Sequence, residues 1–396
     1  MSLNLTASAE RVHIGFFGLR NAGKSSVVNA VTGQSLAVVS DVKGTTTDPV
    51  KKSMELLPIG PVVIIDTPGI DDEGELGEKR IEKTLEILRK TDVAVLVVDS
   101  IKGKQIDDEK LISVFKEKNI PYIVAFNKSD LQSEPYDLKE NEIIVSAVSG
   151  DGINALKEKI GVLAKSKAEQ KFIVADLIEK GDIVVLCIPI DESAPRGRII
   201  LPQQLTLREI LDCNATAVCC QPSELAGMLS VLSKKPRLVI TDSQVFGKVS
   251  TLVPDDITLT SFSILMARYK GELSTLVDGA EALGRIKTGD KILISEGCTH
   301  HRQCNDIGTV KLPDWIRKYT GAEPEFSFTS GGEFPGDLSG FSLVVHCGGC
   351  MLNEREMKSR LEIAASQDVP VVNYGVAIAQ MNGILARSLQ VFTLVN

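Results

Sequence analysis

Five residues near the C-terminal end of the chain have the types and spacing of metal ligands. Cys298 and His300 stand in a Cys-x-His pattern, and His346, Cys347 and Cys350 in His-Cys-x-x-Cys. Thiolates and imidazoles hold zinc in closed tetrahedral sites, and thiolates also hold iron–sulfur clusters. Both interpretations are open on ligand type alone. The Gly-Gly pair between the last two cysteines favours the cluster, because glycine lets the backbone pass close to a bulky group.

A second set of residues, near the N-terminus, has the pattern of a phosphate-binding loop. The apolar run 12–18 ends at Gly18, and Gly23-Lys24-Ser25 follows after four residues. Glycines let several backbone N–H groups turn toward a phosphate, and the helix expected next adds its positive end. Lys24 would reach the β- and γ-phosphates, and Ser25 would bind magnesium. The loop residues expected to contact nucleotide are Gly18, Asn21, Ala22, Gly23, Lys24, Ser25 and Ser26.

Two further segments fit the magnesium and γ-phosphate side of such a site. The run 62–69 is an apolar strand that ends at Asp66, which we expect to hold magnesium through water. Gly69 follows and could contact the γ-phosphate through its N–H. The segment 44–48, Gly-Thr-Thr-Thr-Asp, places Thr46 where a switch threonine completes the magnesium shell. Lys24, Thr46 and Gly69 are therefore the expected catalytic residues.

Residues for reading a base follow on the next strands. The run 124–130 ends in Asn127-Lys128-x-Asp130, and 145–150 contains Ser146 and Ala147. A carboxylate at Asp130 can accept two hydrogen bonds from the N1 and N2 groups of guanine, a donor pair that adenine lacks. The pattern predicts guanine as the base, with Ser146 and Ala147 in a loop behind it.

These five motifs in order resemble the translation-factor-related small GTPases. The residue after the Asp-x-x-Gly motif is Ile70, which cannot orient water, so we expect slow intrinsic hydrolysis. Asn21 resembles the asparagine of a potassium-stimulated subgroup related to tRNA-modification and ribosome-assembly GTPases. The resemblance implies a monovalent-cation site at Asn21. The alternative interpretation is that the asparagine is there only because it suits the geometry of a turn.

The elements that must position these residues alternate between strands and helices. A helix at 153–171 closes the first domain. Strands at 182–191, 216–221 and 237–242 form a middle region, and strands at 289–298, 341–347 and 370–379 a third. The prediction is an α/β chain: a P-loop GTPase domain over 1–168, a smaller α/β domain over 169–268, and a doubly wound α/β domain over 269–396. In doubly wound sheets ligands bind beyond the carboxyl ends of the strands. Both Cys/His groups fall at such ends. A packed βα domain should fold without a structural zinc, which favours the cluster.

Composition narrows the class of protein. The net charge of −8 argues against a general nucleic-acid surface, and no apolar run reaches the ~20 residues of a membrane span. The N-terminus has no apolar signal segment, so we expect a cytoplasmic protein. The cysteines of the middle region, Cys187, Cys213, Cys219 and Cys220, lie in apolar surroundings, where we expect small buried hydrophobes.

A GTPase domain joined to Cys-x-His and His-Cys-x-x-Cys resembles the maturation GTPases of FeFe-hydrogenases, HydF, over the whole chain. The resemblance implies GTP-binding, dimerisation and cluster-binding domains, and a 4Fe-4S cluster held by Cys298, Cys347 and Cys350, with His300 and His346 as the other motif residues. It also implies a scaffold that receives a dinuclear iron precursor, assembled with two radical-SAM maturases, and delivers it to apo FeFe-hydrogenase. Cys304 lies outside the motif.

Three cysteines leave one corner of a cubane for a weaker ligand, where a precursor could attach. We expect His346 or His300 there, with Asp191 or Asp306 as lesser candidates. Two other functions stay open: a ribosome- or tRNA-linked GTPase with a structural zinc, and an electron-transfer protein, which no flavin or nicotinamide motif supports. We also expect the switch segments 41–49 and 67–75 to respond to the γ-phosphate.

Overall fold

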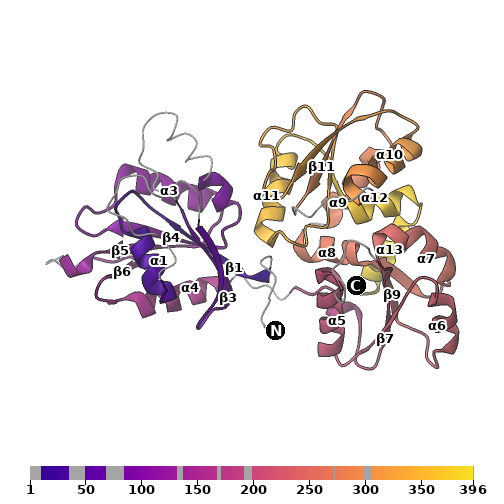
Figure 1. Cartoon of the computed structure of the whole chain (residues 1–396), viewed down its shortest axis with the longest axis horizontal. Helices are drawn as coiled ribbons and strands as arrows, with labels where there is room; N and C mark the ends of the chain where they lie inside the picture. The colour runs from indigo at the N-terminus through magenta and orange to yellow at the C-terminus, as the bar shows by residue number, and fades with distance from the viewer. Residues whose placement is uncertain are drawn as a thin grey trace. The chain divides into compact units, whose positions relative to one another are not determined.

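The computed structural model describes residues 10–34, 50–67, 84–131, 137–166, 171–190, 199–271, 273–297 and 306–395. The chain divides into two compact units, Met1–Glu169 and Gln170–Asn396 (Figure 1). Thr46, Gly69, Ile70, Asp191, Cys298, His300 and Cys304 lie outside the described residues.

The first unit is built on a six-stranded sheet in the order β2-β3-β1-β4-β5-β6, in which only β2 runs antiparallel to its neighbour. Its central strands are nearly continuous apolar runs because helices cover both faces. The strands are β1 Val12–Phe17, β2 Val50–Leu56, β3 Gly60–Asp66, β4 Val93–Asp99, β5 Tyr122–Asn127 and β6 Glu142–Ile144; the helices are α1 Lys24–Thr32, α3 Ile106–Glu117, the 3₁₀ turn η2 Ser129–Leu131 and α4 Ile153–Ser166.

Two apolar layers hold this sheet. Helices α1 and α4 pack on one face, where Val27, Val31 and Leu156 meet Ile14 and Val95. Helix α3 packs on the other face, where Phe115 meets Phe17 and Leu96. The layers fix the carboxyl ends of β1, β3 and β5, which carry the expected nucleotide residues.

The second unit begins with a four-stranded parallel sheet in the order β10-β9-β7-β8. Its elements are η3 Ala175–Leu177, β7 Ile183–Cys187, α5 Leu201–Asp212, β8 Thr216–Cys220, α6 Leu225–Val231, β9 Leu238–Thr241, η4 Ser243–Val245, α7 Phe246–Leu252, β10 Thr258–Ser261 and α8 Phe262–Lys270.

The middle-region cysteines follow the position of their strands in this sheet. Cys187 on central β7 and Cys220 are buried, as predicted. Cys219 is exposed and Cys213 half-buried, so the prediction of a buried thiol is wrong for both. β8 lies at the sheet edge, where one side of the strand faces solvent, and Cys213 is the C-cap of α5 rather than an interior helix residue. Burial raises the pKa of the Cys187 thiol to about 12.

A second four-stranded parallel sheet follows, in the order β12-β11-β13-β14. In Figure 1, α10 and α11 lie on opposite sides of β11. The elements are α9 Leu273–Leu283, β11 Lys291–Glu296, the π-helical turn η5 Ile307–Lys311, α10 Leu312–Thr320, β12 Glu325–Ser330, β13 Leu343–His346, α11 Glu354–Ala365, β14 Val371–Asn373, α12 Tyr374–Met381, α13 Leu385–Leu389 and η6 Gln390–Val395.

The two sheets of this unit share one apolar core. Val185 and Val239 of the first sheet belong to the same buried cluster as Ile292 and Val345 of the second. Helix α13 and η6, at the end of the chain, pack on β10. The middle and third regions therefore form one packed body.

Local assignments from sequence differ from the structure in two places. The predicted strand at 370–379 ends at Asn373, whose Oδ1 accepts a hydrogen bond from Val376 N at 2.7 Å and starts helix α12. A side-chain cap thus overrides the apolar run that followed it. Strand β12, Glu325–Ser330, was not predicted.

Among the described helices, none combines the length and the apolar character that a bilayer crossing requires.

Candidate functional site

The phosphate-binding loop joins β1 to α1. Its backbone turns through left-handed conformations at Asn21, φ 61°, and Gly23, φ 89°. A Cβ at Gly18 would lie 2.2 Å from Val97 O, so the loop passes too close to β4 for any other residue. Lys24 is the first residue of α1, and its Nζ donates to the carbonyl oxygens of Gly18 at 3.0 Å and Leu19 at 2.9 Å. Ala22, Ser25 and Ser26 lie in the same loop and first helical turn.

Two of the expected magnesium residues, Ser25 and Asp66, meet beside this loop. Ser25 Oγ donates to Asp66 Oδ2 at 2.7 Å. Asp66 is 2% exposed, and among the described residues no donor reaches its Oδ1. Burial raises the pKa of Asp66, against the opposing effects of the Ser25 hydrogen bond and the Lys24 charge. A buried carboxylate oxygen without a donor, next to a serine hydroxyl, fits the oxygen-ligand chemistry of Mg²⁺.

Asn127 ties the base-reading strand to the phosphate loop. Its Nδ2 donates to Ala22 O at 3.1 Å, and its Oδ1 accepts from Ala147 N at 3.1 Å. A Cβ at Gly23 would lie 2.3 Å from the same Nδ2, so this close packing needs glycine. One buried amide therefore fixes three loops at once.

Asp130 and Lys128 are held by neighbours in this corner. Ser146 Oγ donates to Asp130 Oδ1 at 2.6 Å. Lys128 Nζ lies 2.6 Å from Asp99 Oδ2 at the end of β4. Burial acts to raise the pKa of Asp99, but hydrogen bonds from Lys128 and Ile101 N, together with the charges of Lys128 and Lys102, outweigh burial and lower the pKa. Sequence reasoning missed Asp99, although it ends the apolar strand that pairs with Asn127.

The described residues of the Cys/His motif, His346, Cys347 and Cys350, lie at the carboxyl end of β13, and Gly297 follows the carboxyl end of β11. These are the central strands of their sheet, and the chain leaves them toward opposite edges, which makes their ends the topological switch point. Gly297 N donates to Cys347 Sγ at 3.0 Å, and Gly349 N lies 3.4 Å from the same sulfur. Cys298, the next residue after Gly297, is outside the described part of the chain. Backbone N–H groups directed at sulfur stabilise a thiolate ligand.

Cys350 sits beside a buried cation. Lys270, the last residue of α8, is 3% exposed, and its Nζ donates to Cys350 O at 3.3 Å and Leu352 O at 3.1 Å. Burial raises the pKa of Cys350, and the Lys270 charge opposes that rise. Sequence reasoning missed Lys270, which is 80 residues from Cys350 along the chain.

Hydrogen bonds engage both ring nitrogens of His346. The ring is 1% exposed; Nδ1 lies 2.7 Å from Cys347 O and Nε2 lies 3.0 Å from Arg360 Nη1. A carbonyl accepts and a guanidinium donates, so Nδ1 carries the proton and Nε2 accepts. Burial, together with the Arg360 charge, lowers the pKa of His346 to about 3. In this arrangement His346 holds the strand end and does not present a nitrogen to a metal.

Arg360 anchors that histidine from helix α11. Its guanidinium also contacts Glu356 Oε1 at 3.0 Å, Gly331 O at 2.7 Å and Ser295 Oγ at 3.3 Å. No sequence signal pointed to Arg360, because a buried arginine in a charged helical segment cannot be distinguished by sequence from one that faces solvent.

The acidic candidates for a fourth ligand are placed differently. Asp306 caps η5, with its Oδ2 accepting from Thr309 N at 2.8 Å. Glu296, a buried carboxylate directly before Gly297, accepts a hydrogen bond from Tyr374 Oη at 3.3 Å. Within the described ranges, no three Cys, His, Asp or Glu side chains converge as a metal site.

Comparison with known families divides the chain into three matches. Residues 13–128 match the 50S ribosome-binding GTPase model. Residues 173–271 match the hydrogen maturase F dimerization domain, and residues 274–391 match the hydrogen maturase F tetramerization domain.

Curated relatives match the GTPase part. The chain is 35% identical over 156 residues to the tRNA modification GTPase MnmE of Chromobacterium violaceum, covering 38% of this chain and 34% of that protein. It is 37% identical over 165 residues to the GTPase Der of Wolinella succinogenes, covering 38% and 35%. The chain thus spans about a third of the length of these relatives.

Solved structures of GTPases are also similar to this chain. The probable GTP-binding protein engB is 25% identical, with a TM-score of 0.32, over 39% of this chain and 100% of that one. Aquifex aeolicus Era bound to GDP and AlF4⁻ is 19% identical, with a TM-score of 0.36, over 61% and 97%. The two maturase models follow the GTPase model without overlap and together match more than half of the chain, so the chain belongs to the hydrogen maturase F family.

Proposed function

We propose that this chain is a GTP-binding and GTP-hydrolysing scaffold and carrier in FeFe-hydrogenase maturation. It binds a 4Fe-4S cluster and delivers a dinuclear iron precursor, assembled with two radical-SAM maturases, to the apo-hydrogenase. The observation that carries the proposal is the succession of a GTPase model and two hydrogen maturase F models on one chain. The proposal includes a GTPase domain over 1–168, a dimerisation domain over 169–268 and a cluster-binding domain over 269–396.

In this proposal Cys298, Cys347 and Cys350 hold the cluster, with His300 and His346 as the other motif residues. The N–H groups of Gly297 and Gly349 support the Cys347 thiolate, and Lys270 fixes the backbone at Cys350. The bound cluster supplies an iron corner without a thiolate, at which a precursor can attach. The hydrogen bonds of His346 favour a positioning role for it, which leaves that corner to His300, a carboxylate or water.

Anaerobic reconstitution tests the cluster directly. We expect the purified chain to bind iron and sulfide and to give the EPR spectrum of a reduced 4Fe-4S cluster. Cys347→Ser and Cys350→Ser should each lose most of the iron, whereas Cys219→Ser, an exposed thiol, should keep it. Zinc without iron in the wild-type chain would contradict the proposal and favour a ribosome- or tRNA-linked GTPase with a structural zinc.

At the other site, Lys24, Ser25, Thr46 and Asp66 serve the phosphates and Mg²⁺, while Asn127, Lys128, Asp130, Ser146 and Ala147 serve guanine. Ile70 offers no hydrogen bond to an attacking water, so intrinsic hydrolysis is slow.

We propose that Asn21, held at φ 61° in the phosphate loop, lines a potassium site that speeds hydrolysis. We expect GTP hydrolysis to be several-fold faster in potassium than in sodium at equal ionic strength. Asn21→Ala should abolish that difference while still binding GDP. Equal rates in the two salts would remove the cation proposal and leave the GTPase assignment intact.

We also propose that copies of this chain assemble through the second unit, as a dimer through the part that contains β7–β10 and as a tetramer through the part that contains β11–β14. The names of the two matching family models, dimerization for residues 173–271 and tetramerization for residues 274–391, support this assignment.

A further inference from the structure

Strand β12 is an open sheet edge. It pairs with β11 on one side, and no described residue pairs with its other side. Glu325 N donates to Asp290 O at 2.8 Å, so the polar backbone groups of Glu325 face inward. Because these groups alternate along a strand, the N–H and C=O of Phe326, Phe328 and Ser330 face outward.

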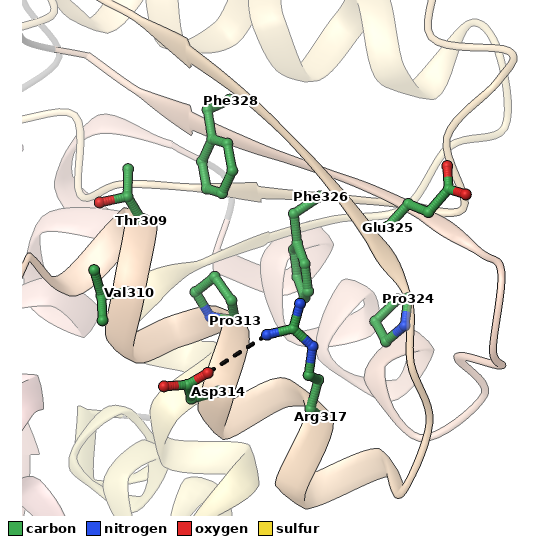
Figure 2. A pocket seen from close by; sticks show the side chains of 9 residues that line it. All are labelled: Thr309, Val310, Pro313, Asp314, Arg317, Pro324, Glu325, Phe326 and Phe328. Atoms are coloured by element: carbon green, nitrogen blue, oxygen red, sulfur yellow. Dashed lines mark hydrogen bonds and ion pairs between the residues drawn. The ribbon is translucent and has the colours of Figure 1, made fainter.

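The same edge carries an apolar groove. Figure 2 shows Phe326 and Phe328 on the side of β12 that faces α10, with Val310 and Pro313 across from them. Phe328 is 39% exposed. At the floor, Arg317 stacks over Phe326 at 5.0 Å, and its charge is balanced by Asp314 at 3.4 Å and Glu323 at 3.0 Å.

Open edges of this kind are normally protected. Lysine, proline or a bulge within an edge strand prevents pairing with another chain. Residues 326–330, Phe-Ser-Phe-Thr-Ser, contain no charge and no proline. An unprotected edge next to the exposed Phe328 is therefore the geometry of an interface.

We propose that a second copy of this chain binds here, with β12 pairing antiparallel to its own counterpart about a two-fold axis at Ser327. This deepens the proposed tetramer assembly and rests on it, since the surface lies wholly within the residues that match the tetramerization model. A two-fold axis brings identical surfaces together, which requires a self-complementary edge.

The strand meets that requirement in the register centred on Ser327. Phe326 of each copy lies opposite Phe328 of the other, which gives two equivalent pairs. In each pair the outward-facing backbone N–H and C=O groups of the two residues exchange hydrogen bonds. Aromatic cross-strand pairs stabilise a sheet, and like charges facing each other destabilise it. Glu325 lies opposite Thr329 of the second copy, so no like charges meet.

The arrangement also places the metal motifs. Two four-stranded sheets would join into one of eight strands. β11 and β13 run parallel to β12, so their carboxyl ends in the two copies point in opposite directions. Cys347 and Cys350, which follow β13, therefore lie at opposite ends of the strands in the two copies and do not share a ligand.

Phe328→Lys tests the surface on the full-length chain, because it adds a charge to the edge without altering the pairing with β11. We expect sedimentation to shift from tetramer to dimer, with circular dichroism and thermal midpoint unchanged. Val162→Lys, on α4 and 66% exposed, is the matched control and should stay tetrameric. A tetrameric Phe328→Lys chain would overturn this surface but not tetramer assembly. A wild-type chain that never exceeds a dimer would overturn both.

A cysteine at the axis tests the register. In the centred register the two Ser327 residues form a non-hydrogen-bonded pair, with Cα atoms about 4.5 Å apart, which suits a disulfide. Mild oxidation of Ser327→Cys should give a disulfide-linked 327–327 peptide by mass spectrometry. Ser366→Cys, exposed after α11, should give none above the wild-type background. Equal linkage in the two variants would exclude the register.

Discussion

At the scale of single residues, the two sites use buried polar groups that have defined partners. Asn127 ties the base-reading strand to the phosphate loop, and His346 ties the end of β13 to helix α11 through Arg360. In each case one side chain holds in place a backbone segment that the expected ligand, a nucleotide or a metal cluster, would contact. The two roles predict different consequences of substitution.

Asp130→Asn should weaken guanine binding. The change replaces charge-assisted hydrogen bonds worth about 1.5–3 kcal/mol, so the Kd for GDP should rise roughly 10- to 150-fold. The amide can donate to an oxygen at C2, so affinity for xanthosine diphosphate should increase. Fluorescent-nucleotide titration measures both. Unchanged GDP affinity would exclude Asp130 as the base-reading residue.

Arg360→Lys and His346→Gln distinguish positioning from ligation at the metal motif. If His346 positions Cys347, both variants should retain less iron after reconstitution, and the EPR signal of the remaining cluster should match wild type. If His346 is a ligand, His346→Gln alone should change the spectrum. Lys358→Ala, an exposed change on the same helix, is the control and should retain wild-type iron.

At the scale of elements, the second unit depends on close contacts between helices and strands. A Cβ at Gly279 of α9 would lie 1.9 Å from Val371 O of β14. No side-chain movement can relieve that clash, because both groups are on the main chain of packed elements.

Gly279→Ala should therefore destabilise the second unit by about 1–3 kcal/mol or more, as expected for overpacking. Gly227→Ala is the matched control, since this glycine also lies in a helix and its Cβ would meet nothing within 4 Å. It should gain up to about 1 kcal/mol in helix propensity. Urea unfolding of the two variants measures the difference, and equal midpoints would contradict the close contact.

At the scale of the whole molecule, the chain has two units whose buried clusters share no members. Ligand binding to one should therefore stabilise that unit alone. GDP with Mg²⁺ at 100 times its Kd adds about 2.7 kcal/mol to the state that binds it.

Calorimetry should show two transitions, of which GDP and Mg²⁺ raise one. Lys24→Ala, which removes the ammonium at the phosphate loop, should abolish the shift and leave both transitions in place. A single transition that moves as a whole would mean that the units unfold together and that nucleotide binding is coupled to the metal motif through the fold.

Residue types and order alone predicted the nucleotide site, because its motifs are short segments that each follow a strand. The α/β class followed from the same local patterns, and the resemblance carried by the GTPase and Cys/His motifs indicated the maturase family. The Cys/His motif was also visible, although ligand types left zinc and iron open. The predicted strand at 370–379 was longer than β14, because an apolar run does not reveal that Asn373 caps a helix.

The tertiary structure decided what depends on neighbours distant in sequence. Lys270 and Cys350 are 80 residues apart, and Asp99 and Lys128 are 29 apart. Whether a charged residue such as Arg360 faces solvent or fills a core depends on the element packed against it, which no local pattern encodes. The open edge of β12 likewise exists only once strand order is known, because a strand's neighbours are set by how the sheet assembles.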